Sequence, residues 1–309
     1  MSHSCSDHHH PGGMHIHGST EGPLLIVSLV VTSLFVLGEA VAGFAAHSLA
    51  LISDAGHNAN DALALGLAAY AIWVAKKPAD AKNTYGYHRV AILTALFNAV
   101  SLVIIGVIIL VEAFELLRNP SPVVGSLMIV VAGISVLMNT VIAKLLSAGA
   151  KTSLNMRAAY IHMAGDALSA AAVVVAGFVV RSTGWVYADP LASALIGLFI
   201  LYSAWGIVRE SVSILLESTP RSVDLDRMVA AMETVPTVNS VHDVHVWTVS
   251  DGMHYLSCHV ELPEGSSIEQ VSNVVGQLNE LLAHDYGIAH ATIQAEVEGT
   301  CLNNPRFCG

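Results

Sequence analysis

Charged residues are scarce in this sequence. They make up 12% of the 309 residues, about half the fraction found in an ordinary soluble domain, whereas hydrophobic residues make up 54%. The scarcity is confined to one part of the chain. Long apolar runs extend to Val208, and the sequence from Arg209 onward has the composition of a soluble domain. This distribution indicates a membrane protein with one small soluble domain.

The sequence also lacks a basic region. From Arg209 to Gly309 there are 4 Lys or Arg and 14 Asp or Glu residues, a balance of −10, while residues 24–208 hold 9 basic and 8 acidic residues. Binding of nucleic acid needs a basic face, so nucleic acid is not an expected partner. An acidic domain is compatible with attraction of cations.

Cysteine is rare, and a secretory signal is not apparent. The four cysteines, Cys5, Cys258, Cys301 and Cys308, are too few for a disulfide scaffold. The N-terminus has neither a basic region nor a small-residue cleavage site after a short apolar core. We therefore expect the thiols to stay reduced if both termini are cytosolic.

Six segments are long and apolar enough to cross a bilayer, which takes about 20 residues: 24–46, 49–75, 90–116, 123–147, 155–181 and 186–208. Nine Lys or Arg residues lie near the ends on one side of these spans and two on the other. The positive-inside rule therefore predicts a multi-pass membrane protein with both termini in the cytosol. The short loops favour a bacterial inner membrane.

After Arg209 the spacing of the hydrophobic residues changes to that of short amphipathic helices and strands. We predict an α+β domain in the order helix, strand, strand, helix, strand, formed by Leu225–Val235, Val238–Val249, His254–Leu262, Ser267–His284 and Ile288–Val297.

Two predicted spans contain paired ionisable residues. Such residues are costly in a bilayer and therefore indicate function. The second span contains His57 and Asp61, and the fifth contains His162 and Asp166. The residues of each pair are four positions apart, which places them on one helix face about 6 Å from each other. The same half-site thus occurs twice.

Two facing half-sites can bind one metal ion. Packed helices lie about 8–10 Å apart, so the two faces can supply two imidazole nitrogens and two carboxylate oxygens. Zn²⁺ accepts four such ligands tetrahedrally, whereas Cu(I) prefers sulfur and Mg²⁺ prefers six oxygens. We predict a zinc site, with Cd²⁺, Co²⁺ and Fe²⁺ still open. The alternative, two local His–Asp hydrogen bonds that only stabilise the bundle, explains the repeated spacing less well.

Two further carboxylates lie in predicted spans. Asp54 is on the same stripe as His57, and it either attracts cations at the entrance to the site or solvates the helix end. Glu39 is well inside the first apolar run, so a purely solvating role does not suit it.

At these residues the chain resembles the zinc-transporting branch of the cation diffusion facilitator family. The resemblance rests on His57-x-x-x-Asp61 and His162-x-x-x-Asp166, which match the two-helix zinc site of that family. It extends from about Pro23 to Val297. Further matches are Ser48–Ala55, the loop signature Tyr85–Arg89, Asp189-Pro190 and Thr292–Gln294.

The resemblance implies a bundle of six transmembrane helices followed by a cytosolic α+β ferredoxin-like domain. It implies a homodimer that exports Zn²⁺ in exchange for protons by alternating access. The implied parts are a His-rich segment (1–22), a transmembrane domain (23–208) and a domain for metal binding and dimerisation (209–309). Manganese- and iron-type members usually carry Asp at the position of His57, so His57 favours zinc.

Metal-binding residue types also occur outside the spans. The resemblance implies a zinc site in the C-terminal domain, formed by residues similar to His242, His259 and Glu296, with His290 near a further ligand. We interpret the N-terminal His-rich segment as a metal-collecting arm. The resemblance also leaves open an accessory site that would combine His3, Cys5, Cys301 and Cys308.

Two other classes of function remain as alternatives. An intramembrane metalloenzyme would need an open coordination position and a general base. The sequence has no His-Glu-x-x-His motif, and four protein ligands would fill a tetrahedron, so we do not expect an enzyme. A membrane-tethered zinc sensor would use the same residues without moving an ion.

Overall fold

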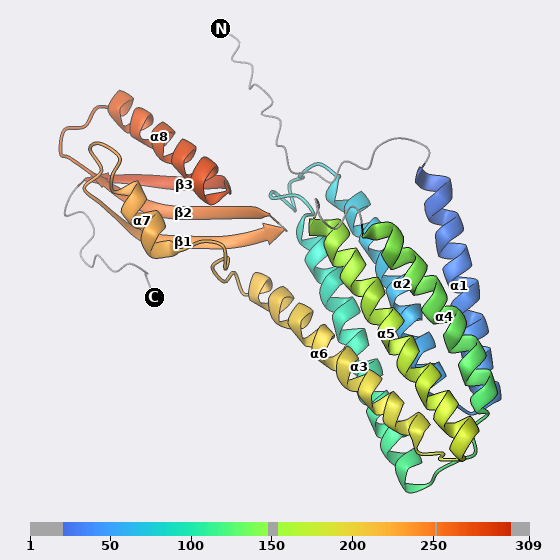
Figure 1. Cartoon of the computed structure of the whole chain (residues 1–309). Helices are drawn as coiled ribbons and strands as arrows, with labels where there is room; N and C mark the ends of the chain where they lie inside the picture. The colour runs from blue at the N-terminus through green and yellow to red at the C-terminus, as the bar shows by residue number, and fades with distance from the viewer. Residues whose placement is uncertain (1–20, 148–153, 251, 298–309) are drawn as a thin grey trace. The chain divides into compact units, whose positions relative to one another are not determined.

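The computed structural model describes residues 21–147, 154–250 and 252–297. Long helices make up the first part of the chain (Figure 1), and they are α1 (Glu21–Ala46), α2 (Leu49–Ala75), α3 (Arg89–Arg118), α4 (Gly125–Leu146), α5 (Leu154–Thr183) and α6 (Ala188–Leu215). Shorter elements follow: α7 (Leu225–Met232), β1 (Ser240–Ser250), β2 (Met253–Leu262), α8 (Ile268–Tyr286) and β3 (Ile288–Val297).

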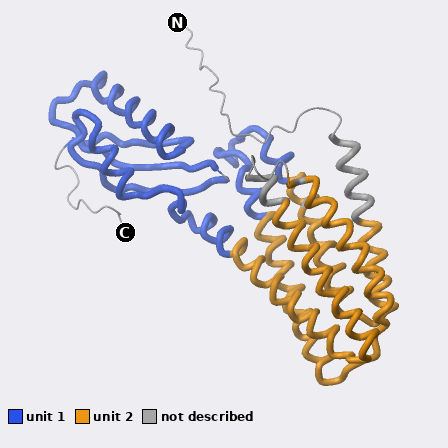
Figure 2. Tube along the Cα trace, in the orientation of Figure 1, with its two compact units in different colours: residues 1–15, 71–93, 209–309 blue, residues 16–70, 94–208 orange. Residues whose placement is uncertain are grey.

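The chain divides into two compact units (Figure 2). We call the described residues within 16–70 and 94–208 the membrane unit, and those within 71–93 and 209–309 the C-terminal unit. The segment 71–93, which joins α2 to α3, therefore groups with the C-terminal residues.

The helices have the composition of membrane spans. Among the described residues, α3, α4, α5 and α6 are long and apolar enough to cross a membrane, while α1 contributes a shorter apolar stretch, Ser33–Ala46. Large apolar side chains such as Phe97, Leu137 and Phe178 are exposed on the outside of the bundle, where lipid can solvate them. A helical membrane domain is confirmed, and the number of six spans stays a prediction.

Glycines allow two pairs of helices to approach closely. A Cβ on Gly125 of α4 would lie 2.6 Å from the carbonyl oxygen of Gly177 in α5. A Cβ on Gly106 of α3 would lie 2.9 Å from Cγ of Leu201 in α6. Neither position has room for a side chain. Close packing of this kind holds helices together in lipid, where hydrophobic burial gives no driving force.

The C-terminal unit contains the predicted helices and strands in the predicted order. The sheet has the order β1-β2-β3, with β2 antiparallel to β1 and parallel to β3. Asp224 caps α7 as expected, since its side chain accepts a hydrogen bond from the backbone of Arg227. Helix α7 ends at Met232, three residues before the predicted Val235, with Glu233 as its C-cap. Pro236 and Thr237, which has a φ of 75°, follow in the turn that leads to β1.

One face of the sheet packs against both helices. The core combines side chains of α7 and α8 with alternate residues of the strands, among them Met228, Leu278, Val244, Leu256 and Cys258. Since side chains alternate across a strand, the residues between these core positions lie on the opposite face. That face carries His242 and His245 of β1 and His259 of β2.

The burial of the Cys258 thiol should affect both its reactivity and the pH dependence of protein stability. Burial raises the pKa of this thiol to about 12, so we expect it to be protonated and unreactive in the folded protein. An ordinary thiol has a pKa of 9.0. Between that pH and about 12, the unfolded protein loses this proton before the folded protein does, so the free energy of unfolding should decrease as pH rises.

With Cys5, Cys301 and Cys308 replaced by Ser, Cys258 should react with a thiol reagent at pH 8 only after denaturation. A matched Ser272→Cys variant, which places a thiol on the exposed face of α8, should react at once. Equal rates for the two thiols in the native protein would contradict the assignment.

Candidate metal centre

The two predicted half-sites meet in the membrane unit. His57 and Asp61 belong to α2, and His162 and Asp166 belong to α5. A spacing of four residues places each pair on one face of its helix. The two faces are turned toward each other, so the structure brings all four predicted residues together.

Each imidazole contacts both carboxylates. His57 Nε2 lies 3.5 Å from Asp61 Oδ2 and 3.2 Å from Asp166 Oδ1. His162 Nε2 lies 3.3 Å from Asp61 Oδ2 and 3.7 Å from Asp166 Oδ2. The two rings meet edge to face, with their centroids 6.2 Å apart. Nitrogen and oxygen atoms therefore alternate around one centre.

The N–O distances can be compared with those between the ligands of a zinc ion. Ligand atoms about 2.0–2.2 Å from a tetrahedral zinc ion lie about 3.3–3.6 Å from one another. Adjacent ligands of an octahedral Mg²⁺ ion, at about 2.0–2.1 Å, would lie only about 2.9 Å apart. The four N–O distances of 3.2 to 3.7 Å are closer to the edges of the tetrahedron than to those of the octahedron, and His57, Asp61 and Asp166 offer ligand atoms within 4.8 Å of one another.

The cluster is closed on one side and open on the other. The side chains of His57 and Asp166 are 8% and 5% exposed, whereas those of Asp61 and His162 are 25% and 47% exposed. Nδ1 of His57 is buried and has no hydrogen-bond partner among the described residues. Nε2 is therefore the nitrogen of His57 that faces the carboxylates.

The beginning of α2 is fixed by a residue of α6. The buried Asp189 accepts hydrogen bonds from the backbone nitrogens of Leu49 and Ala50, at 2.9 and 3.3 Å, and from the hydroxyl of Ser48. A carboxylate at a helix N-terminus satisfies free N–H groups and the helix dipole. Asp189 therefore holds the start of the helix that carries His57 and Asp61.

A polar network fixes α2 to α3 beside the cluster. The amide of Asn60 donates a hydrogen bond of 2.7 Å to Oδ1 of Asn98, and the hydroxyl of Ser101 donates one of 2.6 Å to Oδ1 of Asn60. Amide and hydroxyl side chains hydrogen-bond across membrane helices in this way. Since Asn60 precedes Asp61, the network helps to set the rotation of α2.

Asp54 is not at an open mouth of the bundle. Its side chain is 1% exposed, and Oδ2 accepts a hydrogen bond of 3.4 Å from the hydroxyl of Ser135 in α4. This burial favours a role inside the bundle over the role at the entrance that the sequence allowed.

A second cluster lies on the face of the C-terminal sheet opposite α7 and α8. His242 of β1 is directly opposite His259 of β2, and Glu296 of β3 reaches both. Glu296 Oε2 lies 3.4 Å from His242 Nε2, and Oε1 lies 3.0 Å from His259 Nδ1. Three of the four residues predicted for this domain can therefore offer ligand atoms to one ion.

The buried atoms of this second cluster fit a metal ion. Both ring nitrogens of His242 and Oε2 of Glu296 are buried without a hydrogen-bond partner among the described residues, although two of these atoms are close to each other. Unpaired buried polar atoms are costly, and two imidazoles with a carboxylate are typical zinc ligands.

His290, the fourth residue predicted for this domain, lies elsewhere on the sheet, whereas Asp243 and His245 lie beside the cluster. The ring of His290 packs on Tyr255, with centroids 5.2 Å apart, so His290 is not grouped with the other three residues. Asp243, by contrast, contacts His245 at 2.9 Å and His259 at 3.7 Å. Sequence reasoning missed Asp243 because a bulge in β1, where Asp243 has a φ of 49°, breaks the strand alternation.

Comparison with known proteins identifies the family. Residues 25–216 match the model of the cation efflux transmembrane domain, and residues 220–298 match that of the cytoplasmic domain of cation efflux proteins. The chain belongs to the cation efflux family. The resemblance seen in the sequence motifs is thereby confirmed.

Several members of the family are similar along nearly their whole length. The chain is 33% identical to the cadmium, cobalt and zinc/H(+)-K(+) antiporter of Bacillus subtilis, with 96% of each chain covered. It is 36% identical to the zinc transporter ZitB of Escherichia coli, with 96% of this chain and 93% of the relative covered. A solved metal-bound C-terminal domain of the CzcD transporter of Cupriavidus metallidurans is 34% identical, with a TM-score of 0.22, 24% of this chain and 99% of that chain covered.

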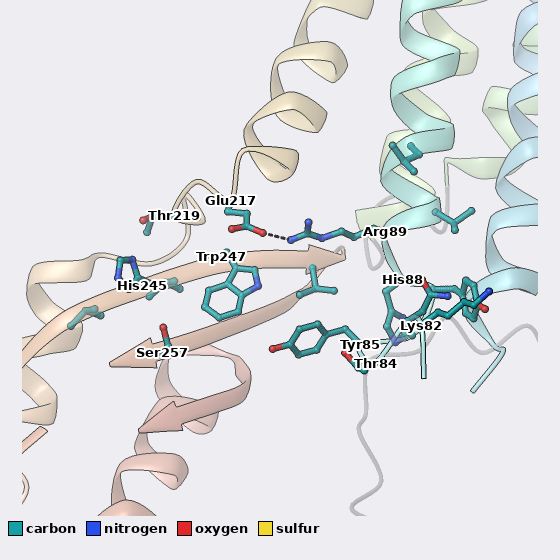
Figure 3. A pocket seen from close by; sticks show the side chains of 18 residues that line it. Lys82, Thr84, Tyr85, His88, Arg89, Glu217, Thr219, His245, Trp247 and Ser257 are labelled. Carbon is teal, nitrogen blue, oxygen red and sulfur yellow. Dashed lines mark hydrogen bonds and ion pairs between the residues drawn. The ribbon is translucent and has the colours of Figure 1, made fainter. Parts of the chain in front are cut away.

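The loop signature of this cation efflux protein lines a cavity of about 760 Å³ within the C-terminal unit (Figure 3). Arg89 donates a hydrogen bond of 2.9 Å to Glu217 there, and the ring of Tyr85 lies edge-on to Tyr255 with centroids 5.5 Å apart. The hydroxyl of Tyr87 donates to Asp80 and thereby holds the pKa of that carboxyl below its usual value. These contacts join the signature to other residues of the C-terminal unit, and both metal clusters lie elsewhere among the described residues.

The proposed accessory residues His3, Cys5, Cys301 and Cys308 lie outside the described residues.

The C-terminal cluster predicts a measurable metal content. Glu296→Gln removes the carboxylate that contacts both histidines, so the purified full-length protein should bind about one zinc ion fewer per chain. Metal analysis after equilibration with Zn²⁺ and desalting measures this content. Glu269→Gln, a change in the exposed first turn of α8, is the matched control. An unchanged zinc content in the Glu296 variant would remove the cluster from consideration.

Proposed function

We propose that this cation efflux protein exports Zn²⁺ from the cytosol through His57, Asp61, His162 and Asp166. The observation that carries the proposal is the meeting of two imidazoles and two carboxylates inside the helix bundle, with four N–O distances of 3.2 to 3.7 Å, since these are ligand types that zinc prefers. Relatives named as zinc transporters and as cadmium, cobalt and zinc antiporters support the same class of substrate. Cd²⁺ and Co²⁺ are therefore further candidate substrates.

The charges of the cluster explain exchange for protons. Two carboxylates buried in a bundle need positive charge nearby. One Zn²⁺ ion supplies two charges, and so do protons on the two imidazoles. Because the imidazoles can bind metal only when unprotonated, Zn²⁺ and protons compete for the same centre. A proton gradient can then drive export when the centre is exposed alternately to the two sides.

The organisation of the chain follows from the same proposal. We assign residues 23–208 to a domain of six spans and residues 209–309 to a cytosolic ferredoxin-like domain that binds metal and dimerises. The two family matches, at 25–216 and 220–298, support this division. Both termini face the cytosol of a bacterial inner membrane. The N-terminal 22 residues collect metal on the cytosolic side.

The alternative functions make different demands. A zinc sensor would bind zinc without moving it, and a metalloenzyme would leave one coordination position open for water. The membrane cluster offers four side chains to one centre, which favours transport over hydrolysis. Zinc flux across vesicles distinguishes the transporter from both alternatives.

Removal of one carboxylate should abolish transport. In proteoliposomes with an imposed pH gradient, Asp61→Ala or Asp166→Ala should reduce zinc-dependent proton flux to the background of empty vesicles, because three ligands and unbalanced charge remain. Glu112→Gln, which changes an exposed carboxyl of α3, should transport like the natural protein. Undiminished zinc flux in either Asp variant would refute the assigned site.

The nitrogen of His57 should set the choice of metal. His57→Asp replaces a borderline nitrogen ligand by a hard oxygen, so the ratio of Zn²⁺ to Mn²⁺ transport should fall by about tenfold. Metal-by-metal flux in the same vesicles measures the ratio. His88→Asp, a change in the loop after α2, should leave the ratio as it is, and an equal fall in both variants would speak against His57 as a ligand.

A further inference from the structure

The metal cluster of the membrane unit is covered by packed side chains toward one end of the bundle. In α2, residues 53–55 lie just before His57 and are at most 2% exposed, whereas none of the described side chains from 61 to 70 is buried. In α5 the order is reversed: none of the described side chains from 160 to 165 is buried, and a buried stripe begins at Asp166. The two helices are antiparallel, since their ligands pair in opposite order along the chain. Both patterns therefore place the cover at the end where α2 begins.

Asp189 joins α6 to α2 at this covered end. It lies in the first turn of α6 and is 0% exposed. Its carboxylate accepts hydrogen bonds from the hydroxyl of Ser48 and from the backbone nitrogens of Leu49 and Ala50, at the start of α2. The carboxylate thus lies at the N-termini of two helices, both of which stabilise negative charge. We call these hydrogen bonds the Asp189 contact.

Further close contacts join other helices at the same end. The backbone nitrogen of Val124, just before α4, donates a hydrogen bond of 2.9 Å to the carbonyl oxygen of Ala46, the last residue of α1. Gly125 and Gly177 leave no room for a side chain between α4 and α5. The chain passes from α1 into α2 within two residues. The Asp189 contact adds α6 to these helices, so that all of them are joined at the covered end.

We propose that Asp189 is a positioning residue of the transport site. Its contact holds the outer ends of α2 and α6 together while the metal cluster is open to the cytosol, and the contact breaks when the cluster opens outward. This inference rests on the proposed zinc export. The end where α6 begins is taken as the outer end, because the match to the cytoplasmic domain follows the other end of α6. The hydrogen bonds of Asp189 go to residues 48–50, so Asp189 acts through α2 rather than on the ion.

The burial of the Asp189 contact favours two alternative states. Because Asp189 is fully enclosed, a small displacement of α6 would leave a carboxylate, a hydroxyl and two N–H groups buried without partners, which is costly. When the outer ends separate far enough for water to enter, water can replace each of these hydrogen bonds. Intermediate positions of α6 are therefore disfavoured. Loss of the contact should shift the equilibrium from the state open to the cytosol toward the state open outward.

A purely structural role for Asp189 is the alternative. A carboxylate at a helix N-terminus stabilises that helix in any conformation of the protein, so its removal would then weaken the bundle without favouring one side of the membrane. A positioning role predicts a change on one side alone, because residues between the contact and the cluster become accessible from outside. Ser53 is such a residue. It lies one turn before His57 on the same face of α2 and is 1% exposed.

The experiment measures access to a thiol at position 53 from the outer side. Ser53→Cys replaces a buried hydroxyl by a thiol, in full-length protein whose other cysteines, except the buried Cys258, are replaced by Ser. A membrane-impermeant thiol reagent is applied to spheroplasts of bacteria that express this protein. Addition of Asp189→Asn, which leaves one accepting oxygen in place of two, or of Ser48→Ala should raise the labelling rate about tenfold, since each removes a hydrogen bond to a charged group.

A second buried thiol controls for general loosening of the bundle. Ala113 is 1% exposed and lies on the face of α3 that carries Gly106, which packs closely on α6. The Ala113→Cys thiol should stay unlabelled in every background, because the proposal leaves the packing of α3 on α6 intact. Ser48→Ala makes the smaller change, so it tests the proposal even if Asp189→Asn does not fold.

Two results would overturn the proposal: no rise in labelling of Ser53→Cys with either change, or an equal rise for Ala113→Cys. The second result would assign Asp189 a purely structural role. The labelling uses no zinc, so failure of the proposed export is distinguishable, because it would appear as absent zinc flux in the natural protein.

Discussion

Positive charge is the scarce component inside the membrane unit, and the arrangement of its polar residues depends on this scarcity. Four buried or half-buried carboxylates, those of Glu39, Asp54, Asp61 and Asp166, lie on α1, α2 and α5. The described parts of these helices place no Lys or Arg beside them. The histidines His57 and His162, a bound metal ion or protons must therefore balance the carboxylates. A cluster built in this way is sensitive to both metal and pH, because no other cation pairs with these carboxylates among the residues that the structure describes.

Helix α2 has to be held in place for this balance to work, and its restraints come from helices that are distant in sequence. Asp189 of α6 binds the N-terminus of α2, the Asn60 network joins α2 to α3, and Asn58 joins it to α1. A carboxylate that caps a helix gains hydrogen bonds that partly replace its lost hydration. Asp189 is thus an ionisable residue whose burial is explained by structure, in contrast to Asp54.

The sequence predicted those features that depend on local spacing. His57 with Asp61 and His162 with Asp166 were identified because a helix places residues four apart on one face, and the strands of the C-terminal unit were identified from their alternation. The contact of Asp189 with α2 depends on residues about 140 positions apart, and no local pattern encodes it. Asp243 was missed, and His290 was grouped with the wrong neighbours, because a bulge and the strand register decide which residues meet.

The two clusters differ in what remains after metal leaves, and this difference argues for different roles. In the membrane cluster, each imidazole nitrogen faces two carboxylate oxygens, so protons can take the place of the ion and keep the charges paired. In the C-terminal cluster, His242 is 3% exposed, and neither of its nitrogens has a hydrogen-bond partner within the described part of the chain. Loss of an ion there would leave buried polar atoms unpaired, which opposes release. The first arrangement suits an ion that passes through, and the second suits an ion that stays.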